Sequence, residues 1–163
     1  MNESDKRPYE AVYKYIQKHG LVEEKYYPYE NSIASPERKE CRLETVRDEN
    51  GNPPQRTYID DYKKGEVKKG CTFLSDELEK GPVVVGLDAR NFRIYEYGRF
   101  TDCQRKITHY ALLVGKGIGY WKVRNSWGKK WGERGYIRIR IEESSDVCGI
   151  CLRGSVPVSS SWF

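Results

Sequence analysis

The chain has 163 residues, of which 37% are hydrophobic and 13% aromatic, and this is enough for one domain with a modest core. The net charge is +5, but lysine and arginine are spread along the chain beside acidic residues, so the composition argues against a nucleic-acid-binding groove. No run approaches the roughly 18 apolar residues of a membrane span, and we expect no membrane partner.

The first part of the chain is mostly polar and contains few predicted elements. Apolar residues at positions 9, 12, 13 and 16 predict a helix over Pro8–Lys18, and Gly20 provides its stop signal. Within the polar middle of the chain, we expect one strand at Thr57–Tyr62. A second, short helix is predicted over Ser75–Lys80, where Gly81-Pro82 ends it.

Four later segments have the patterns of strands. Val83–Asp88 is a nearly continuous apolar run with β-branched residues, which predicts a buried strand. Ala111–Val114 and Tyr120–Val123 are apolar and flank the flexible glycine-rich turn Gly115–Gly119. Tyr136–Ile141 alternates apolar residues with arginine. Together these segments predict an α+β fold in which antiparallel strands form a β-barrel-like sheet with short helices.

One histidine and one asparagine stand at the open ends of the predicted hairpin. His109 stands where its first strand begins, and Asn125 stands where its second strand ends. Because antiparallel pairing brings these ends together, we expect the two side chains to be neighbours. An imidazole oriented by an amide is the base half of a nucleophilic catalytic site, although such a pair is more often only a polar contact on a hairpin.

The residues around this pair match a known family. The run from Asn125 reads Asn-Ser-Trp-Gly-x-x-Trp-Gly-x-x-Gly-Tyr, and the run from His109 reads His-x-Ala-x-x-Val-Gly. This pattern resembles the C-terminal half of papain-like cysteine proteases, the cathepsin family. Further matches occur in the family's order, at Tyr27-Pro-Tyr29-Glu, Gly81–Ala89, Tyr95-x-x-Gly98, Cys103 and Cys148-Gly-Ile.

The resemblance covers nearly the whole chain. It implies that residues 1–163 are the C-terminal portion of a papain-like peptidase domain, with the fold of its right-hand domain. It also implies that His109 takes a proton from a cysteine thiol and later protonates the leaving amine, while Asn125 orients the ring. Trp127 would cover this hydrogen bond from water, and Trp131 would lie at the leaving-group side of the cleft. Simple core packing is the alternative explanation for both tryptophans, and it is compatible with these roles.

The resemblance assigns three residues to substrate binding. Gly86, Ile107 and Tyr110 would line the pocket that receives the side chain two residues before the scissile bond. Gly86 would leave this pocket roomy. Tyr110 stands where the family usually has alanine or glycine, so that its ring would fill or block the same space.

Five cysteines add information on covalent structure. The resemblance pairs Cys103 with Cys148, in a disulfide that closes a loop of about 45 residues. It pairs Cys41 with a partner that would lie before residue 1, and it assigns no partner to Cys71 or Cys151. Disulfides indicate an oxidising compartment, and the family is extracellular or lysosomal, although the polar N-terminus of this chain carries no signal-peptide core.

The sequence Cys148-Gly-Ile-Cys151, with Cys103 and His109 elsewhere, leaves a zinc site open as an alternative. A single C-x-x-C without a second matching pair is weak evidence for zinc. A redox dithiol is equally weakly supported, because no helix-forming run follows the motif. We therefore expect no metal and no cofactor.

The family's nucleophile does not occur in the sequence. The catalytic cysteine of papain-like proteases precedes the histidine by roughly 130–150 residues, which would place it before Met1. Its motif Cys-Gly-Ser-Cys-Trp is absent from this chain, as are the upstream oxyanion glutamine and the Cys-Asn-Gly-Gly turn. We therefore expect the N-terminal half of the peptidase domain, with the nucleophilic cysteine, to be missing.

The function that follows is that of a cysteine-type endopeptidase family member that holds only His109 and Asn125 and is inactive alone. Its partners would be peptide or protein substrates once an N-terminal half completes it, and protease inhibitors. Two alternatives stay open. In the first, the chain is a catalytically inactive papain-like binding module. In the second, it is a secreted domain that disulfides or zinc stabilise.

Overall fold

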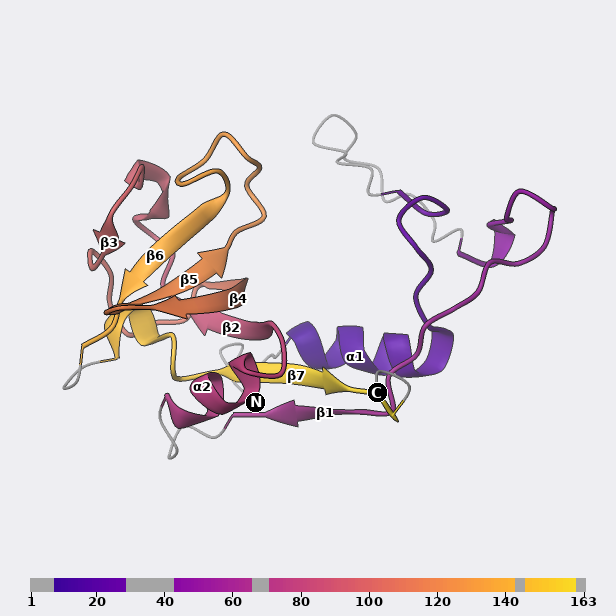
Figure 1. Ribbon diagram of the computed structural model, residues 1–163, viewed down its shortest axis with the longest axis horizontal. Coiled ribbons are helices and arrows are strands. Elements are labelled where there is room, and N and C mark those ends of the chain that lie inside the picture. Colours follow the sequence, from indigo (N-terminus) through magenta and orange to yellow (C-terminus); the bar gives the residue numbers. More distant parts are fainter. Residues whose placement is uncertain (1–7, 29–42, 66–70, 143–145, 161–163) are drawn as a thin grey trace. The chain divides into compact units, whose positions relative to one another are not determined.

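The structure, a computed structural model, describes residues 8–28, 43–65, 71–142 and 146–160 (Figure 1). These residues fall into two units. One runs up to Asp61 and resumes at Pro157, and the other spans Tyr62–Val156. In the described part of the chain, no helix is both long and apolar enough to cross a membrane.

The first unit begins with helix α1 (Pro8–His19), which ends one residue beyond the predicted span. Tyr9, Tyr13 and Ile16 recur at spacings of four and three residues, and all three are buried. Gly20 has a φ of +70°, and its N–H donates to the carbonyl of Ile16 at 2.9 Å. A glycine in this conformation ends the helix, as the sequence predicted.

An arginine ties the end of α1 to the following short helix η2 (Leu43–Thr45). Arg56 donates from Nη1 to the carbonyl of His19 at 2.8 Å. Its Nη2 donates to the carboxylate of Glu44 at 3.0 Å. The guanidinium therefore satisfies one of the last carbonyls of α1, which have no partner within the helix.

The structure has no continuous strand over the predicted range Thr57–Tyr62. Thr57 makes only an isolated antiparallel bridge with Leu21, in which each N–H donates to the other's carbonyl at 2.8 Å. The regular strand of this region is β1 (Asp61–Lys64), which begins four residues later than predicted.

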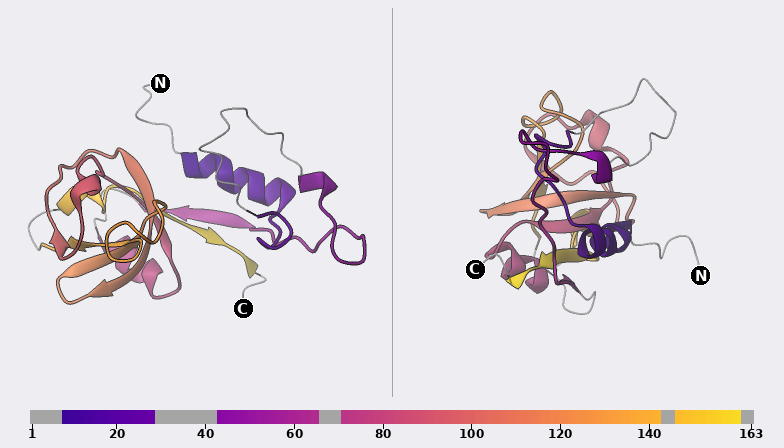
Figure 2. Two further views of the ribbon diagram at one scale, coloured as in Figure 1. Left: turned by 90° about the horizontal axis from the view of Figure 1, so that it is seen from above. Right: turned by 90° about the vertical axis from the view of Figure 1, so that its right-hand side faces the viewer.

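A seven-stranded sheet in the order β1-β7-β2-β4-β5-β6-β3 dominates the fold, and both β1 and β7 have residues in each unit. This order makes the fold α+β with an open sheet, so the predicted barrel does not close. The strands twist relative to one another (Figure 2). The remaining strands are β2 (Val83–Leu87), β3 (Arg99–Phe100), β4 (His109–Gly117), β5 (Tyr120–Arg124), β6 (Tyr136–Arg140) and β7 (Gly154–Val158).

The described helices of the second unit are short: α2 (Thr72–Leu78), η4 (Phe92–Ile94) and η5 (Val147–Gly149). Helix α2 begins three residues earlier than predicted. Strands β3 and β7 were not predicted, because β3 has only two residues and β7 contains Pro157, which is rare inside strands. The pair β3 and β6 is parallel, which departs from the expected antiparallel arrangement.

The hairpin of β4 and β5 is longer and tighter than predicted. Five residues, Gly115–Gly119, were expected to form its turn, but β4 continues through Gly117, and only Ile118 and Gly119 connect the strands. Gly119 has a φ of +74°, a conformation that glycine adopts without steric cost. A register shift between Leu113 and Gly115 marks a bulge in the ladder.

The core of the second unit lies against this sheet. Alternate residues of the strands are fully buried, as expected where one face packs on the interior. They include Val83, Val85, Leu87, Leu113, Val123, Ile137 and Ile139, together with Phe92 of η4, all with 0% exposure. The core therefore fixes the hairpin whose open ends carry His109 and Asn125.

Two disulfides join the described cysteines. Cys103 pairs with Cys148, as the family resemblance implied. The sequence left Cys71 and Cys151 unassigned, and the structure pairs them with each other. Cys41, which the resemblance paired with an upstream cysteine, lies outside the described residues.

Candidate active site

His109 and Asn125 meet across the open end of the hairpin, as the sequence predicted. His109 is the first residue of β4, and Asn125 directly follows β5. The Nε2 atom of His109 lies 3.0 Å from the Oδ1 atom of Asn125. The backbone N–H of Asn125 donates to the carbonyl of Gly135 at 2.9 Å, so the start of β6 holds the asparagine in place.

The hydrogen bonds of Asn125 determine which ring nitrogen of His109 carries the proton. The backbone N–H of Ser126 donates to Oδ1 of Asn125 at 2.8 Å, which identifies this atom as the amide oxygen. Because an amide oxygen only accepts, Nε2 of His109 must donate to it. The Nδ1 atom of the neutral ring is then the basic nitrogen and makes no hydrogen bond with the residues that the structure describes.

Trp127 lies beside the ring of His109. Its ring centroid lies 5.6 Å from that of His109, and 40% of the residue is exposed. Trp131 packs edge-on against Trp127 with 5.2 Å between centroids. The Nε1–H of Trp131 donates to the carbonyl of Phe92 at 2.9 Å, which anchors its ring to the core. Trp127 is thus the more exposed of the two rings and the one beside the histidine.

The sequence reasoning missed Asp88. This carboxylate follows β2 and has an exposed fraction of only 1%. It accepts hydrogen bonds from Arg90 at 2.7 and 2.9 Å and from the backbone N–H of Gln104 at 2.7 Å. Its Oδ1 also lies 3.5 Å from Oγ1 of Thr108, which immediately precedes His109. The sequence feature that could have revealed this buried carboxylate is its position, because Asp88 is the acidic residue at the end of the otherwise apolar run Val83–Asp88.

The hydrogen bond with Arg90 lowers the pKa of Asp88 well below its ordinary value, against the opposing effect of burial. The carboxylate therefore stays charged at neutral pH. A charged group buried to this degree needs several donors. Arg90 supplies some of them from two residues further along the chain, and Gln104 and Thr108 supply the others from the segment that leads into β4.

Gly86, Ile107 and Tyr110 lie together. Gly86 of β2 pairs with Tyr110 of β4 in the sheet register. A Cβ atom added at Gly86 would lie 3.0 Å from Cγ2 of Ile107 and 3.2 Å from Cε1 of Tyr110. Nη1 of Arg153 donates to the Tyr110 hydroxyl at 3.1 Å. The space left by the missing side chain of Gly86 is therefore filled from within the chain.

Comparison with known proteins agrees with this geometry. Residues 7–158 match the model of a family described as papain family cysteine protease. The chain belongs to the papain family. It is 31% identical over 150 residues to Cathepsin L 1 of Paramecium tetraurelia. This match covers 91% of this chain and 42% of that protein. It is also 35% identical over 160 residues to Zingipain-1 of Zingiber officinale. That match covers 93% of this chain and 66% of Zingipain-1.

Solved structures give the same result for the fold. The cysteine protease CMS1MS2 of Carica candamarcensis, in complex with E-64, superposes with a TM-score of 0.76 at 26% identity. This match covers 91% of this papain-family chain and 66% of the other. The chain therefore spans between two fifths and two thirds of the length of these relatives.

The papain-family chain offers no free thiol in the part that the structure describes. Cys71, Cys103, Cys148 and Cys151 are all in disulfides. A disulfide sulfur is neither a nucleophile nor a base, because the reactive species is the thiolate. The cysteine six residues before His109 is thus occupied by its bond to Cys148.

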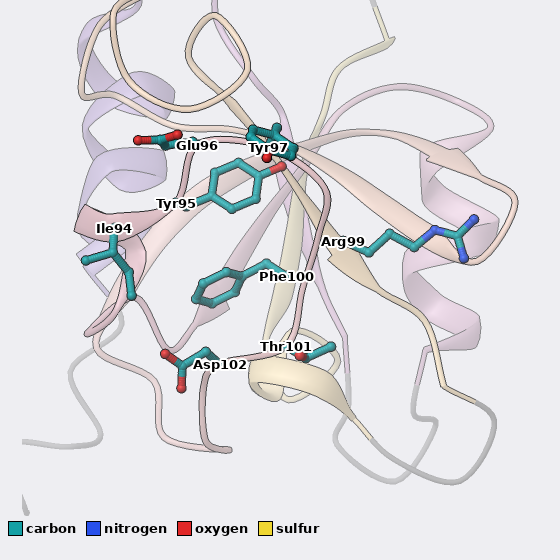
Figure 3. A pocket seen from close by; sticks show the side chains of 8 residues that line it. All are labelled: Ile94, Tyr95, Glu96, Tyr97, Arg99, Phe100, Thr101 and Asp102. Carbon is teal, nitrogen blue, oxygen red and sulfur yellow. The ribbon is translucent and has the colours of Figure 1, made fainter.

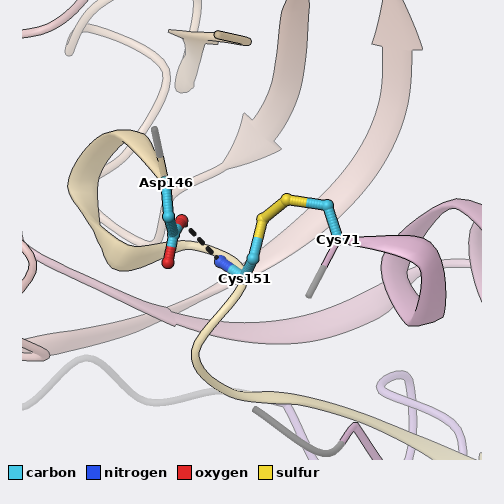
Figure 4. Close-up of side chains that lie close together, drawn as sticks. All are labelled: Cys71, Asp146 and Cys151. Carbon is cyan, nitrogen blue, oxygen red and sulfur yellow. Dashed lines mark hydrogen bonds between the residues drawn. A yellow bond between two sulfur atoms is a disulfide. The ribbon is translucent and has the colours of Figure 1, made fainter. Parts of the chain in front are cut away.

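A second cluster contains side chains of the types that bind metal ions, namely Cys71, Asp146 and Cys151 (Figure 4). Their potential ligand atoms lie within 4.8 Å of one another, but two of them are joined as a disulfide. The Asp146 carboxylate accepts the backbone N–H of Cys151 at 3.0 Å, and burial raises its pKa. With the sulfurs bonded to each other, this cluster lacks the thiolates that zinc prefers.

A hollow of about 340 Å³ lies elsewhere on the second unit, between Ile94 and Asp102 (Figure 3). Tyr95 and Phe100 form its buried floor, whereas Tyr97 is 80% exposed. Glu133 accepts hydrogen bonds from the Tyr95 hydroxyl at 2.8 Å and from the Gly98 N–H at 2.9 Å. Neither His109 nor Asn125 lines this hollow, so it is separate from the candidate active site.

Proposed function

We propose that this chain supplies the histidine and asparagine of a cysteine-peptidase active site. The nucleophilic cysteine and its oxyanion donors would come from a polypeptide segment outside residues 1–163. The observation that carries the proposal is the 3.0 Å contact between His109 Nε2 and Asn125 Oδ1, which leaves Nδ1 as the basic nitrogen. Membership of the papain family supports the same reaction class.

In the proposed reaction, Nδ1 of His109 takes the proton of the cysteine thiol and forms a thiolate–imidazolium pair. The thiolate attacks the carbonyl carbon of the scissile peptide bond, and His109 returns the proton to the leaving amine. Water, deprotonated by the same nitrogen, then hydrolyses the thioester. Asn125 keeps the ring in one orientation throughout, and Trp127 excludes water from their hydrogen bond.

The filled space above Gly86 supports a narrow substrate specificity. With Ile107 and Tyr110 within 3.2 Å of the position of an added Cβ, little room remains for a bulky substrate side chain there. We propose that the complete enzyme accepts small side chains two residues before the scissile bond. Trp131 would border the leaving-group side.

Covalent structure supports an extracellular or lysosomal location for the protein. Both described disulfides require an oxidising environment to form and persist. The proposed partners are peptide or protein substrates, and inhibitors directed at cysteine proteases. The related Carica candamarcensis enzyme was solved in complex with E-64.

The deciding experiment is the intact mass of the protein isolated from its natural source, before and after treatment with a thiol-directed peptide epoxide. We expect a mass well above 19.1 kDa and a label on a cysteine outside this chain. In that protein, His109→Ala should abolish peptide hydrolysis and strongly slow labelling. His19→Ala, which changes the only other histidine, is the matched control and should leave both intact.

A mass of 19.1 kDa with no labelling would contradict the proposal. It would leave the catalytically inactive binding module, because every described cysteine is disulfide-bonded. A count of bound zinc equal to one per chain would instead favour the metal-stabilised domain.

A further inference from the structure

The hollow of about 340 Å³ between Ile94 and Asp102 combines an apolar floor with exposed apolar side chains (Figure 3). The rings of Tyr95 and Phe100 meet edge-on beneath it, with 5.7 Å between their centroids. Tyr97 and Ile94 line it with exposed fractions of 80% and 74%. They are two of the three most exposed large hydrophobic residues in the described part of the chain. Such a hollow suits a ligand with an apolar part.

Two carboxylates border the same hollow. Glu96 and Asp102 both line it, and both are exposed. Neither side chain forms an ion pair or a hydrogen bond with a residue that the structure describes. Exposed acids are common on protein surfaces and alone indicate nothing. Here they stand beside an apolar floor, so the hollow offers apolar contact and negative charge together.

The cations near this hollow are directed elsewhere. Among the residues that line it, only Arg99 is cationic. Its guanidinium lies beside the β4–β5 turn, because its Nη1 would be 3.2 Å from a Cβ atom added at Gly119. Its side chain extends away from the other labelled residues (Figure 3). Arg90, which shares a neighbouring hollow with Asp102, is paired with Asp88 at 2.7 Å. The hollow itself is therefore acidic.

Hydrogen bonds hold the walls of the hollow in place. The carboxylate of Glu133 accepts the Tyr95 hydroxyl at 2.8 Å and the N–H of Gly98 at 2.9 Å, which fixes the turn that follows Tyr97. Arg138 donates to the same carboxylate at 2.9 Å and balances its charge. A preformed site loses little conformational entropy when a ligand binds.

We propose that this hollow, hereafter the Tyr97 hollow, binds an arginine or lysine side chain of another polypeptide. These side chains join an apolar stem to a terminal cation, so the stem would cover the apolar floor while Glu96 and Asp102 attract the cation. The exposed ring of Tyr97 would offer its π face to the same cation. An apolar residue next to the basic one would cover Ile94. The site does not depend on peptide hydrolysis.

The test is a titration with the peptide Ala-Leu-Arg-Leu-Ala, acetylated and amidated at its ends. The complete protein is used with the substitution His109→Ala, so that it cannot hydrolyse the peptide. The readout is the NMR signals of the backbone amides of Tyr97 and Thr101, which both line the hollow. We expect a saturable shift of both signals. A matched peptide with citrulline, which has the shape of arginine without its charge, should bind about fivefold more weakly.

Substitutions in the same protein locate the basic side chain. Glu96→Gln combined with Asp102→Asn should weaken binding of the arginine peptide about tenfold and abolish its advantage over the citrulline peptide. Tyr97→Ala should weaken binding about threefold, as expected for loss of an exposed cation–π contact. All three side chains are exposed, so these variants should stay folded. Glu79→Gln removes an exposed acid outside the hollow and should leave the affinity unchanged.

Three results would overturn the proposal. The first is a shift that does not saturate, and the second is equal affinity for the arginine and citrulline peptides. The third is binding that Glu96→Gln/Asp102→Asn leaves as strong as Glu79→Gln does. Because the readout is binding by a variant that cannot hydrolyse peptides, failure here is distinguishable from failure of the proposed peptidase function.

Discussion

The carboxylate of Asp88 accepts the backbone N–H of Gln104 at 2.7 Å, although the two residues are 16 positions apart. Asp88 directly follows β2, the strand that pairs with β4, and Gln104 starts the segment that leads to His109. The Oγ1 of Thr108, in the same segment, accepts the N–H of Ala89 at 3.0 Å. The buried carboxylate thereby anchors the segment that leads to His109 of the candidate site.

Replacing this carboxylate should destabilise the protein. We expect Asp88→Ala to lower the free energy of unfolding by about 2–4 kcal/mol, because the Gln104 N–H and Arg90 lose a charged acceptor. Urea unfolding followed by circular dichroism measures the change. Asp102→Asn is the control, since Asp102 is exposed, and it should stay within about 0.5 kcal/mol of the original chain. Equal effects of the two substitutions would contradict the role of Asp88.

The same carboxylate should give the protein an acid-sensitive stability. The pKa of Asp88 in the folded chain lies below its ordinary value of 3.8. As pH falls, the unfolded chain therefore binds this proton first, so the stabilisation is present above pH 3.8 and is lost toward the lower folded pKa. Urea midpoints measured between about pH 6 and pH 3 should fall more steeply for the original chain than for Asp88→Ala. Parallel curves would show that Asp88 contributes nothing to acid denaturation.

Tyr110 should control the specificity of the complete enzyme. Tyr110→Ala opens the space above Gly86, and we expect kcat/KM for peptides with leucine two residues before the scissile bond to rise about tenfold relative to alanine. Tyr110→Phe keeps the ring and removes the hydroxyl that accepts from Arg153, so its specificity should resemble that of the original enzyme. An unchanged leucine-to-alanine ratio in Tyr110→Ala would place the substrate side chain elsewhere.

The two disulfides should contribute similarly to stability. They join residues 45 and 80 positions apart, and loop-closure entropy gives about 4 kcal/mol for each, with a difference of only about 0.5 kcal/mol. We expect the double variants Cys103→Ser/Cys148→Ser and Cys71→Ser/Cys151→Ser to lose comparable free energy of unfolding, as urea titration would show. Loss of stability in only one of them would mean that native-state packing outweighs the chain entropy.

Trp127 should protect the hydrogen bond between His109 and Asn125. Trp127→Ala exposes the pair to water, so we expect the Nε2 proton of His109 to exchange at least about tenfold faster in NMR spectra. Global stability should change little, because Trp127 is already 40% exposed. Tyr97→Ala removes an exposed aromatic ring from a different surface and serves as the control. Exchange that is equally fast in both variants would assign the protection to other residues.

Much of the candidate site could be predicted from the sequence, because it depends on short-range patterns. The apolar runs of β4 and β5, with glycines between them, specify a hairpin, and a hairpin necessarily brings His109 close to Asn125. Helix α1 follows from the spacing of its apolar residues and from Gly20. The Asn-Ser-Trp-Gly run is a local sequence feature that points to the papain family, to which the chain belongs.

Other features were decided only by the tertiary structure. Cys71 and Cys151 are 80 residues apart, and no local pattern states that they meet. The donors of Asp88 come from residues up to 20 positions away, and the unpaired amide nitrogen of Asn125 becomes visible only when all neighbours are placed. Sequence patterns report which face of an element is apolar. Which distant groups satisfy or leave unsatisfied a buried polar atom depends on how those elements pack.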